Sequence, residues 1–304
     1  NFVQWAHEQY PAQHYYLSVV NHGRGTTGVA WDETSRGDYL SPTELRSALD
    51  LATQGGRWKI DVLHYDACLM AMLEEAYQIQ KYADYMVGYE NLGWSVLAYE
   101  QYVALVGRGN ATPRELAAGI ASAYFNEPRI LTRPRTISAL DLSSLGRVHE
   151  AVNALASALG DNLQDFKSDI LAARNAAQKF DSQDYNRLSV EDEYVDLYHL
   201  AALIKERIPD ASVQTAAQEV MERIANELVI ASYAYSGYQS GAEGAGNYWD
   251  LDNAHGVSIY FPPNWGSMDY HQYVGHTLFR FTASSLWDNF LADFFAIRGL
   301  PPTP

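Results

Sequence analysis

One histidine and the chain's single cysteine have the residue types and the placement for nucleophilic catalysis. His22 follows the apolar run "YYLSVVN" at 15–21, and Cys68 comes shortly after the run "IDVLHY" at 60–65. Such β-branched, apolar runs are typical of strands buried on both faces of a parallel sheet. The carboxyl ends of adjacent parallel strands meet at one edge of the sheet, so we expect His22 and Cys68 to face each other there. A cysteine with an imidazole nearby predicts acyl transfer.

The surroundings of Cys68 allow two interpretations. The stretch "ACLMAMLEEAYQIQKY" at 67–82 predicts a helix that begins directly before the cysteine. Free N–H groups and the helix dipole at that end would favour a thiolate. The alternative is a small buried hydrophobic residue, which is the commoner role of an isolated cysteine. Because there is only one cysteine, an intrachain disulfide and a metal site of several thiolates are both excluded.

The glycines of "HGRGTTG" also match the spacing of a dinucleotide-binding loop. Gly23, Gly25 and Gly28 form a G-x-G-x-x-G pattern. Such a loop has to open a helix, whose N-terminus holds the pyrophosphate. Here the next helix is predicted only from Pro42, and Thr43 stands where an acidic residue is required. The sequence therefore disfavours a nicotinamide enzyme. An α/β-hydrolase is excluded because the chain has no G-x-S-x-G pentapeptide.

Strands and helices alternate along the first half of the chain. Capping boxes with a following proline begin two of the helices, at Ser41 and at Thr112. Strands are predicted at 15–21, 60–65, 84–90 and 135–142. This alternation predicts an α/β fold, with a mainly parallel sheet covered by helices on both faces, an α/β/α sandwich.

The second half has a different character and leaves the domain boundary open. Most of it is predicted to be helical, with a polar break at 179–194. Strand-like runs return at 228–236 and 255–263, and we expect them to complete the same sheet. We therefore place a catalytic core at 1–142 and a largely helical region at 143–304.

Composition narrows the class of protein. The 304 residues are 47% hydrophobic and 19% charged, which supports a folded core. The formal net charge of −16 disfavours nucleic acid and anionic membranes as partners, and no apolar run is long enough to span a membrane. The 22 tyrosines and 7 tryptophans favour a secreted or envelope protein. The chain opens at Asn1 inside a predicted helix, so we expect that an upstream segment has been removed.

The stretches around the predicted His–Cys dyad carry a family resemblance. "VVNHGRG", followed by "IDVLHYDACLMAMLEEAYQIQKYADYMVGYE", resembles the clostripain family of cysteine peptidases. That family belongs to a clan with the caspases, gingipains, legumains and separases, whose signature is a strand ending in His-Gly and a second strand ending in a motif with Cys. The strong motifs lie within 15–100, and a weaker likeness extends to "DEYVDLYHLAALI" and "HGVSIYFP". The resemblance implies a caspase-like fold and a bacterial cysteine endopeptidase.

The resemblance also implies a role for each residue of the motif. Cys68 would be the nucleophile, and His22 would be the general acid and base of a thioester mechanism. The backbone N–H groups of Gly23 and Cys68 would form the oxyanion hole. Members of this clan need no third triad residue.

Relatives in this family cleave after arginine or lysine, which implies an acidic S1 pocket. Asp66 would pair with the basic side chain of the substrate. Alternatively, it caps a helix that starts at Ala67. The segment after "GYE" is shorter than is usual in the family. Glu90 would then supply part of the missing charge, and Trp94 would be either a pocket wall or ordinary core.

Further expectations concern processing, calcium and partners. Clostripain-like proteins are often zymogens cut between His and Cys, and Arg36 is the candidate here; the alternative is an ordinary solvated arginine. Calcium activates some relatives, and the acidic segments 181–193 and 250–253 have suitable oxygens, although acidic loops are usually just solvated. No organic cofactor is expected. The expected partners are peptide or protein substrates with Arg or Lys at P1, and the family's additional N-terminal segment as a separate piece.

The competing function is a binding or scaffold protein that keeps the caspase-like fold without turnover. The presence of both His22 and Cys68 favours the peptidase. The shortened segment after Glu90, and the family elements not found before Asn1, favour the scaffold. The sequence leaves the physiological substrate, the oligomeric state and the choice between Arg and Lys open.

Overall fold

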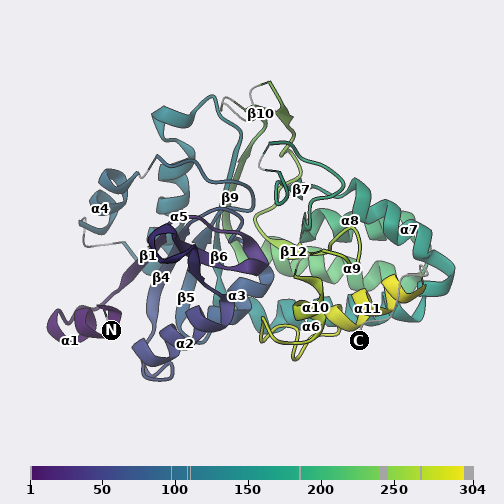
Figure 1. Cartoon of the computed structure of the whole chain (residues 1–304), viewed down its shortest axis with the longest axis horizontal. Helices are drawn as coiled ribbons and strands as arrows, with labels where there is room; N and C mark the ends of the chain where they lie inside the picture. Colours follow the sequence, from purple (N-terminus) through teal and green to yellow (C-terminus); the bar gives the residue numbers. More distant parts are fainter. Residues whose placement is uncertain are drawn as a thin grey trace.

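A five-stranded sheet is the centre of the fold. The computed structural model describes residues 2–96, 98–107, 109, 111–184, 186–239, 246–267 and 269–297. The strand order is β1-β4-β5-β6-β9 (Figure 1). These strands are β1 (Tyr16–Val20), β4 (Ile60–Asp66), β5 (Ala83–Gly88), β6 (Arg135–Asp141) and β9 (Val229–Tyr235). All four runs predicted as strands in the first half therefore belong to this sheet.

The sheet is mixed, and its three N-terminal strands are parallel. β1 pairs with β4 and β4 with β5 in parallel, whereas β6 runs antiparallel to both β5 and β9. The connection between β5 and β6 explains why β6 is antiparallel to β5. It returns to the end of the sheet at which β5 finishes, and β6 begins there. Trp94, after β5, donates its backbone N–H to Tyr124 Oη at 2.8 Å and its indole N–H to Pro134 O at 2.7 Å. Pro134 directly precedes β6, so β6 runs back across the sheet.

Helices cover both faces of the sheet. The covering helices are α4 (Tyr99–Gly107) and α5 (Pro113–Phe125) on one face, and α2 (Pro42–Ala52) and α3 (Leu73–Ile79) on the other. Side chains of neighbouring residues in β4 point to opposite faces of the sheet. Val62 belongs to the hydrophobic cluster under α5, and Leu63 belongs to the cluster under α2 and α3. Both predicted capping boxes are formed, at Ser41 and Thr112. The predicted fold class is confirmed.

The second half adds a group of helices at one side of the sheet (Figure 1). They are α6 (Leu145–Asp161), α7 (Leu163–Ala176), α8 (Leu197–Arg207), α9 (Ala211–Arg223) and α11 (Trp287–Ile297). A second sheet, in the order β12-β8-β7, is built from β12 (Ser258–Tyr260), β8 (Tyr194–Asp196) and β7 (Lys179–Phe180). Of the two late strand-like runs, 228–236 thus enters the main sheet as β9, while 255–263 enters the second sheet as β12.

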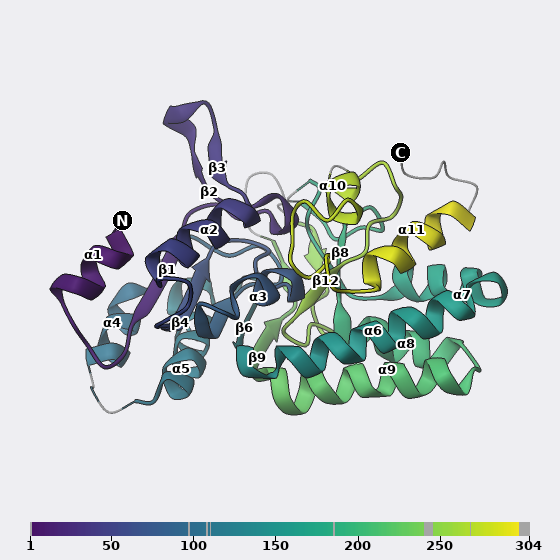
Figure 2. The same ribbon diagram turned by 90° about the horizontal axis from the view of Figure 1, so that it is seen from below.

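The remaining elements are short. They are α1 (Phe2–Gln9), α10 (Tyr270–Val274), β2 (Val29–Asp32), β3 (Asp38–Leu40), β10 (Gly237–Tyr238), β11 (Tyr248–Trp249), the turns η1 (Gly25–Thr27), η2 (Glu33–Ser35), η3 (Pro128–Ile130) and η4 (Leu142–Ser144), and the π-helical η5 (Ile224–Leu228). β2 and β3 form a hairpin that projects from the body (Figure 2). None of the described helices is both long and apolar enough to cross a membrane.

Candidate active site

Two strand ends place His22 and Cys68 at the same edge of the sheet. In the parallel pair of β1 and β4, Val20 lies opposite Asp66. Continued for two residues beyond each strand, this register brings His22 to the level of Cys68. Both residues line one open cleft of about 940 Å³, together with Asp66 and Trp94. The structure therefore brings together the histidine and the cysteine that the strand pattern predicted to face each other.

Cys68 does not lie at a helix N-terminus, so that expectation is wrong. α3 begins only at Leu73, and the segment before it is an irregular connection. Leu69 in this connection has a left-handed φ of 64°, and its N–H donates to Asn91 O at 3.1 Å. The apolar residues 69–72 fit a helical pattern, but they are buried beside the chain that follows β5. Tertiary contacts here outweigh the local helical preference.

Burial and hydrogen bonding have opposite effects on the pKa of the Cys68 thiol. Its Sγ accepts a hydrogen bond from Gly93 N at 3.3 Å. Burial has the larger influence and raises the pKa of the thiol. The helix dipole that was expected to favour a thiolate is not at Cys68, because α3 begins only at Leu73. A base has to remove the proton before Cys68 becomes a strong nucleophile, and the imidazole of His22 lies in the same cleft.

The loop after His22 packs directly on the cysteine segment. A Cβ on Gly23 would lie 2.3 Å from Cys68 O and 3.0 Å from Ala67 Cβ, so this close approach requires glycine. Within the described ranges, no other residue accepts a hydrogen bond from the backbone N–H of Gly23 or of Cys68. Both residues line the cleft, so two backbone donors remain available there.

The glycine-rich loop lacks the geometry of a dinucleotide site. After Gly23 the chain forms the short turn η1 and then enters β2, so no α-helix begins at this loop. The loop therefore has no helix N-terminus whose N–H groups could bind a pyrophosphate. The structure agrees with the sequence in disfavouring a nicotinamide enzyme.

Asp66 is the last residue of β4, and its carboxylate lies at the wall of the cleft. Its Oδ1 accepts a hydrogen bond from Tyr89 Oη at 2.6 Å, and its Oδ2 accepts one from Tyr99 Oη at 3.1 Å. No helix starts at Ala67, so Asp66 is not a helix cap. Each carboxylate oxygen keeps a further lone pair for a cationic partner.

Glu90 does not line the cleft, and the interpretation of this residue as part of an S1 pocket is wrong. It is 1% exposed, and its Oε2 accepts a hydrogen bond from Gly256 N at 2.9 Å. Burial, followed by the neighbouring Asp196 carboxylate, raises the pKa of Glu90 well above its usual value. Side chains alternate along extended backbone, so the turn of Tyr89 toward Asp66 sends Glu90 the other way.

Trp94 is a half-buried wall of the cleft. Its indole N–H is fixed by Pro134 O, and the Arg133 guanidinium lies over its ring at 4.6 Å from the centroid. Trp94 lines the cleft and also packs against the cluster under α5, so the structure leaves both interpretations of this residue open.

The β2–β3 hairpin projects from the body (Figure 2). Arg36 lies between η2 and β3 at its turn, and it does not line the cleft. It is exposed and has a left-handed φ of 66° directly after η2. Gly37 N donates to Asp32 O at 3.1 Å and closes the turn. The hairpin connects β1 to α2, so Arg36 stands in the chain between His22 and Cys68.

Two carboxylates in the acidic segments expected to hold calcium accept hydrogen bonds from the chain itself. Asp192 in the first segment accepts hydrogen bonds from Ser182 N at 2.8 Å and Ser189 N at 2.6 Å. Asp252 in the second accepts one from Ser236 Oγ at 2.5 Å. In the part of the chain that the structure describes, no group of three or more His, Cys, Asp or Glu side chains is arranged to hold a metal ion. Calcium dependence stays a prediction.

Several residues of the cleft were not predicted from the sequence. Tyr89 and Tyr99 hold Asp66, and Gly93 contacts the thiol. Trp31 and Asp32 of the hairpin line the cleft as well. The alternation of side chains after β5 could have indicated Tyr89. The hairpin residues had no sequence signal, because their position depends on where the hairpin lies relative to the ends of β1 and β4.

Comparisons with known proteins agree with this geometry. The sequence profile described as "Clostripain family" matches residues 1–294. A curated protein named "Clostripain", from Hathewaya histolytica, is 24% identical over 336 residues. The match covers 95% of this chain and 60% of the relative. The chain therefore spans less than two thirds of the length of that relative.

Two solved structures of similar architecture are described as C11 proteases. A secreted C11 cysteine protease from Bacteroides thetaiotaomicron, in complex with an irreversible peptide inhibitor, has a TM-score of 0.66 and 23% identity over 95% of this chain and 77% of that chain. An inactive zymogen C11 protease from Parabacteroides distasonis has a TM-score of 0.61 and 20% identity over 86% of this chain and 68% of that one. At these identities the likeness shows the shared fold.

Proposed function

The chain belongs to the clostripain family of cysteine peptidases, and from this premise we propose that it is a cysteine endopeptidase. The observation that carries the proposal is the register of two parallel strands. It sets His22 and Cys68 at the same level in one cleft. Cys68 is the nucleophile, and His22 is the general base and acid.

The reaction needs one proton carrier and one nucleophile, and the cleft has both. His22 takes the proton of the Cys68 thiol, whose pKa is raised by burial, and the sulfur attacks the carbonyl carbon of the substrate. The tetrahedral intermediate expels the amine, to which His22 returns the proton, and a thioester with Cys68 remains. His22 then removes a proton from water, which attacks the thioester. The acid product leaves, and the thiol regains its proton.

The developing oxyanion needs hydrogen-bond donors that are already in place. The N–H groups of Gly23 and Cys68 lie at the cleft without another acceptor among the described residues. We assign them to the oxyanion. Each donor of this kind is worth about 3 kcal/mol in the transition state.

The substrate side chain that suits this cleft is basic. Asp66 lies two residues before Cys68 and faces the cleft, with its two oxygens oriented by Tyr89 and Tyr99. A guanidinium can pair with both oxygens of a carboxylate, whereas an ammonium makes a point contact. We therefore propose cleavage after arginine and, less efficiently, after lysine.

The hairpin suits a role in activation. The Parabacteroides protein is described as an inactive zymogen. In this chain Arg36 is exposed at a hairpin turn and has the side chain that Asp66 would select. We propose that the chain is cut after Arg36. The Bacteroides protein is described as secreted, and we propose the same location for this chain.

The test is hydrolysis of fluorogenic peptides with Arg, Lys, Asp or Asn before the reporter, under reducing conditions and with or without calcium. The protein is compared with Cys68→Ala and His22→Ala. We expect cleavage of the Arg peptide, weaker cleavage of the Lys peptide, and loss of both in each variant.

Two other results would change the assignment. Cleavage only after Asp or Asn would keep the dyad and remove Asp66 from the specificity pocket. No cleavage of any peptide, by intact protein or by protein cut at the hairpin, would favour a scaffold that keeps the fold without turnover.

A further inference from the structure

The loop that carries His22 is closed on itself by backbone hydrogen bonds. Ala30 N donates to His22 O at 2.9 Å, and Arg24 N donates to Gly28 O at 3.0 Å. These bonds make residues 22–30 one small closed unit, in which η1 forms the tip. The position of the imidazole and of the Gly23 N–H therefore depends on what holds this unit as a whole.

A tyrosine from the second sheet holds the tip. Tyr194, in β8, is 1% exposed. Its Oη donates to Arg24 O at 3.0 Å and accepts from Thr26 N at 3.1 Å. A Cβ on Gly25 would lie 2.4 Å from the Tyr194 ring, so the ring rests directly on the backbone of the loop. Burial raises the pKa of Tyr194, which keeps its hydroxyl a donor.

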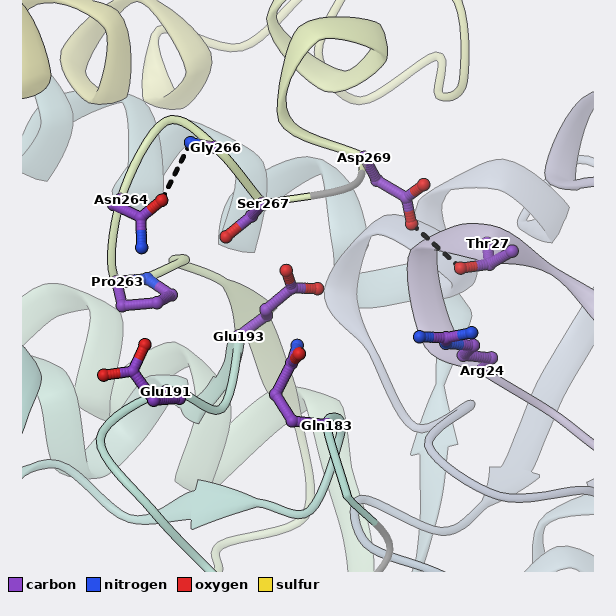
Figure 3. Close-up of a pocket in the computed structure, with 10 residues that line it drawn as sticks. All are labelled: Arg24, Thr27, Gln183, Glu191, Glu193, Pro263, Asn264, Gly266, Ser267 and Asp269. Carbon is purple, nitrogen blue, oxygen red and sulfur yellow. Dashed lines mark hydrogen bonds between the residues drawn. The ribbon is translucent and has the colours of Figure 1, made fainter. Parts of the chain in front are cut away.

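An aspartate from the C-terminal part holds the same tip from a second side. Asp269 Oδ2 accepts hydrogen bonds from Thr26 Oγ1 at 2.7 Å and Thr27 Oγ1 at 3.0 Å. Figure 3 shows Asp269 bonded to Thr27 at the rim of a cavity of about 320 Å³ that Arg24 also lines. The contact thus lies between the loop of His22 and the last part of the chain.

The same few groups form one buried network. A carboxylate only accepts, so Thr26 gives its hydroxyl proton to Asp269. Tyr194 has one hydroxyl proton, for which Arg24 O at 3.0 Å and Thr26 Oγ1 at 2.9 Å are both acceptors, and its oxygen accepts from Thr26 N. Because each of these groups has a partner, the network favours one position for the loop.

The opposite side of the loop is the nucleophile segment. Gly23 packs on Cys68 O, so the loop is clamped between Cys68 and the pair Tyr194 and Asp269. We propose that Tyr194 and Asp269 are positioning residues, which set the imidazole of His22 and the N–H of Gly23 against Cys68. This inference rests on the proposed function, and it assigns part of the catalytic geometry to the half of the chain that lacks the dyad.

The test uses substitutions that keep shape and remove one hydrogen bond. Tyr194→Phe keeps the ring on Gly25, and Thr27→Val keeps the branched side chain. The matched control is Tyr260→Phe in neighbouring β12, because the Tyr260 hydroxyl is buried and has no hydrogen-bond partner among the described residues. Peptide hydrolysis, the melting temperature and the pH profile of Cys68 alkylation by iodoacetamide are measured for each.

We expect kcat to fall about 10- to 100-fold in Tyr194→Phe, with KM within about twofold, because a small misplacement of the base costs rate and not substrate binding. Thr27→Val should also lower kcat, by a smaller factor than Tyr194→Phe. The alkylation profile of Tyr194→Phe should move toward that of His22→Ala. Tyr260→Phe should match the unmodified protein in kcat and in alkylation.

Other outcomes overturn the inference in separate ways. If Tyr194→Phe melts at a lower temperature but keeps kcat and the alkylation profile, the network only stabilises the fold. If the unmodified protein and His22→Ala give the same alkylation profile and neither cleaves peptides, the dyad itself is wrong, and the proposed function fails together with the inference.

Discussion

Asp66 is the residue on which the proposed Arg preference of the cleft depends. Its oxygens accept from Tyr89 and Tyr99, and an asparagine can accept one of these bonds without carrying charge. We expect Asp66→Asn to lower kcat/KM for the Arg peptide roughly 10- to 100-fold, which corresponds to the loss of one charge-assisted hydrogen bond. Steady-state kinetics with Arg and uncharged peptides measure the change in preference.

Glu90→Gln is the matched control for this substitution. Glu90 is a nearby carboxyl that is buried away from the cleft and bonded to Gly256. Its replacement should leave the ratio of Arg to uncharged peptide unchanged, whatever it does to stability. A loss of Arg preference in Glu90→Gln with none in Asp66→Asn would contradict the assignment of Asp66.

Two adjacent glutamates of α3 predict an unusual dependence of stability on pH. Glu74 and Glu75 are fully buried, and burial raises the pKa of Glu74 to about 7 and of Glu75 to about 8. A folded pKa above the unfolded one means that the folded state holds the proton more tightly. Their contribution to the free energy of unfolding is complete below the unfolded-state pKa, near 4.5. It is lost as the pH rises from there through the folded-state pKa values of about 7 and about 8.

Glu75→Gln should flatten this dependence. Gln keeps an oxygen for the Tyr65 hydroxyl but has no proton to lose. Each unit of pKa shift corresponds to about 1.4 kcal/mol, so the loss of stability between about pH 5 and about pH 8 should shrink by up to about 4 kcal/mol. Thermal unfolding across this range measures the effect. Equal slopes for both proteins would show that Glu75 is not protonated in the fold.

At the scale of elements, the β2–β3 hairpin predicts a single cleavage. Arg36 is at its exposed turn, and the strands around it are short. Arg36→Gln should leave the purified protein as one chain where the unmodified protein becomes two, as seen by denaturing gel electrophoresis and mass spectrometry. Arg57→Gln is the control, because Arg57 is also exposed and precedes β4. Continued cutting in Arg36→Gln would place the site elsewhere.

The sequence could predict the strands that position the site. Residues 15–21 and 60–65 are apolar and β-branched, and the helix between them has a capping box and a proline at its start. Those signals are local, and they specify that two strand ends share an edge. The proximity of His22 and Cys68 can be predicted from this arrangement, because each residue follows one of the two strands.

Other features depend on contacts that no local pattern records. The segment 69–72 has helical periodicity but pairs with the chain after β5. Glu90 carries the right charge for a basic pocket, yet its side chain points to Gly256. The direction of β6 depends on where α5 ends, and the hold of Tyr194 on the loop of His22 spans more than half of the chain. Such distant pairings are set by the assembled core.

At the scale of the whole molecule, the net charge of −16 predicts a dependence on ionic strength. A negatively charged protein attracts cationic peptides. Salt screens this attraction, whose range is about 8 Å at physiological ionic strength. We expect kcat/KM for an Arg peptide to fall several-fold between about 50 mM and about 500 mM NaCl. An uncharged peptide should show almost no change. Equal salt effects on both peptides would assign the selectivity to Asp66 alone.

The hairpin between β1 and α2 has one more consequence for the intact molecule. A cut after Arg36 puts His22 and Cys68 on different fragments, and no disulfide can join residues 1–36 to residues 37–304, because Cys68 is the one cysteine among them. The working enzyme would then be a two-chain complex, joined by the pairing of β1 with β4 and by the hold of Tyr194 and Asp269. Once unfolded, such a complex refolds as a bimolecular reaction, whose yield falls on dilution. Activation would thereby turn one folding chain into a two-chain enzyme whose recovery from unfolding depends on its concentration.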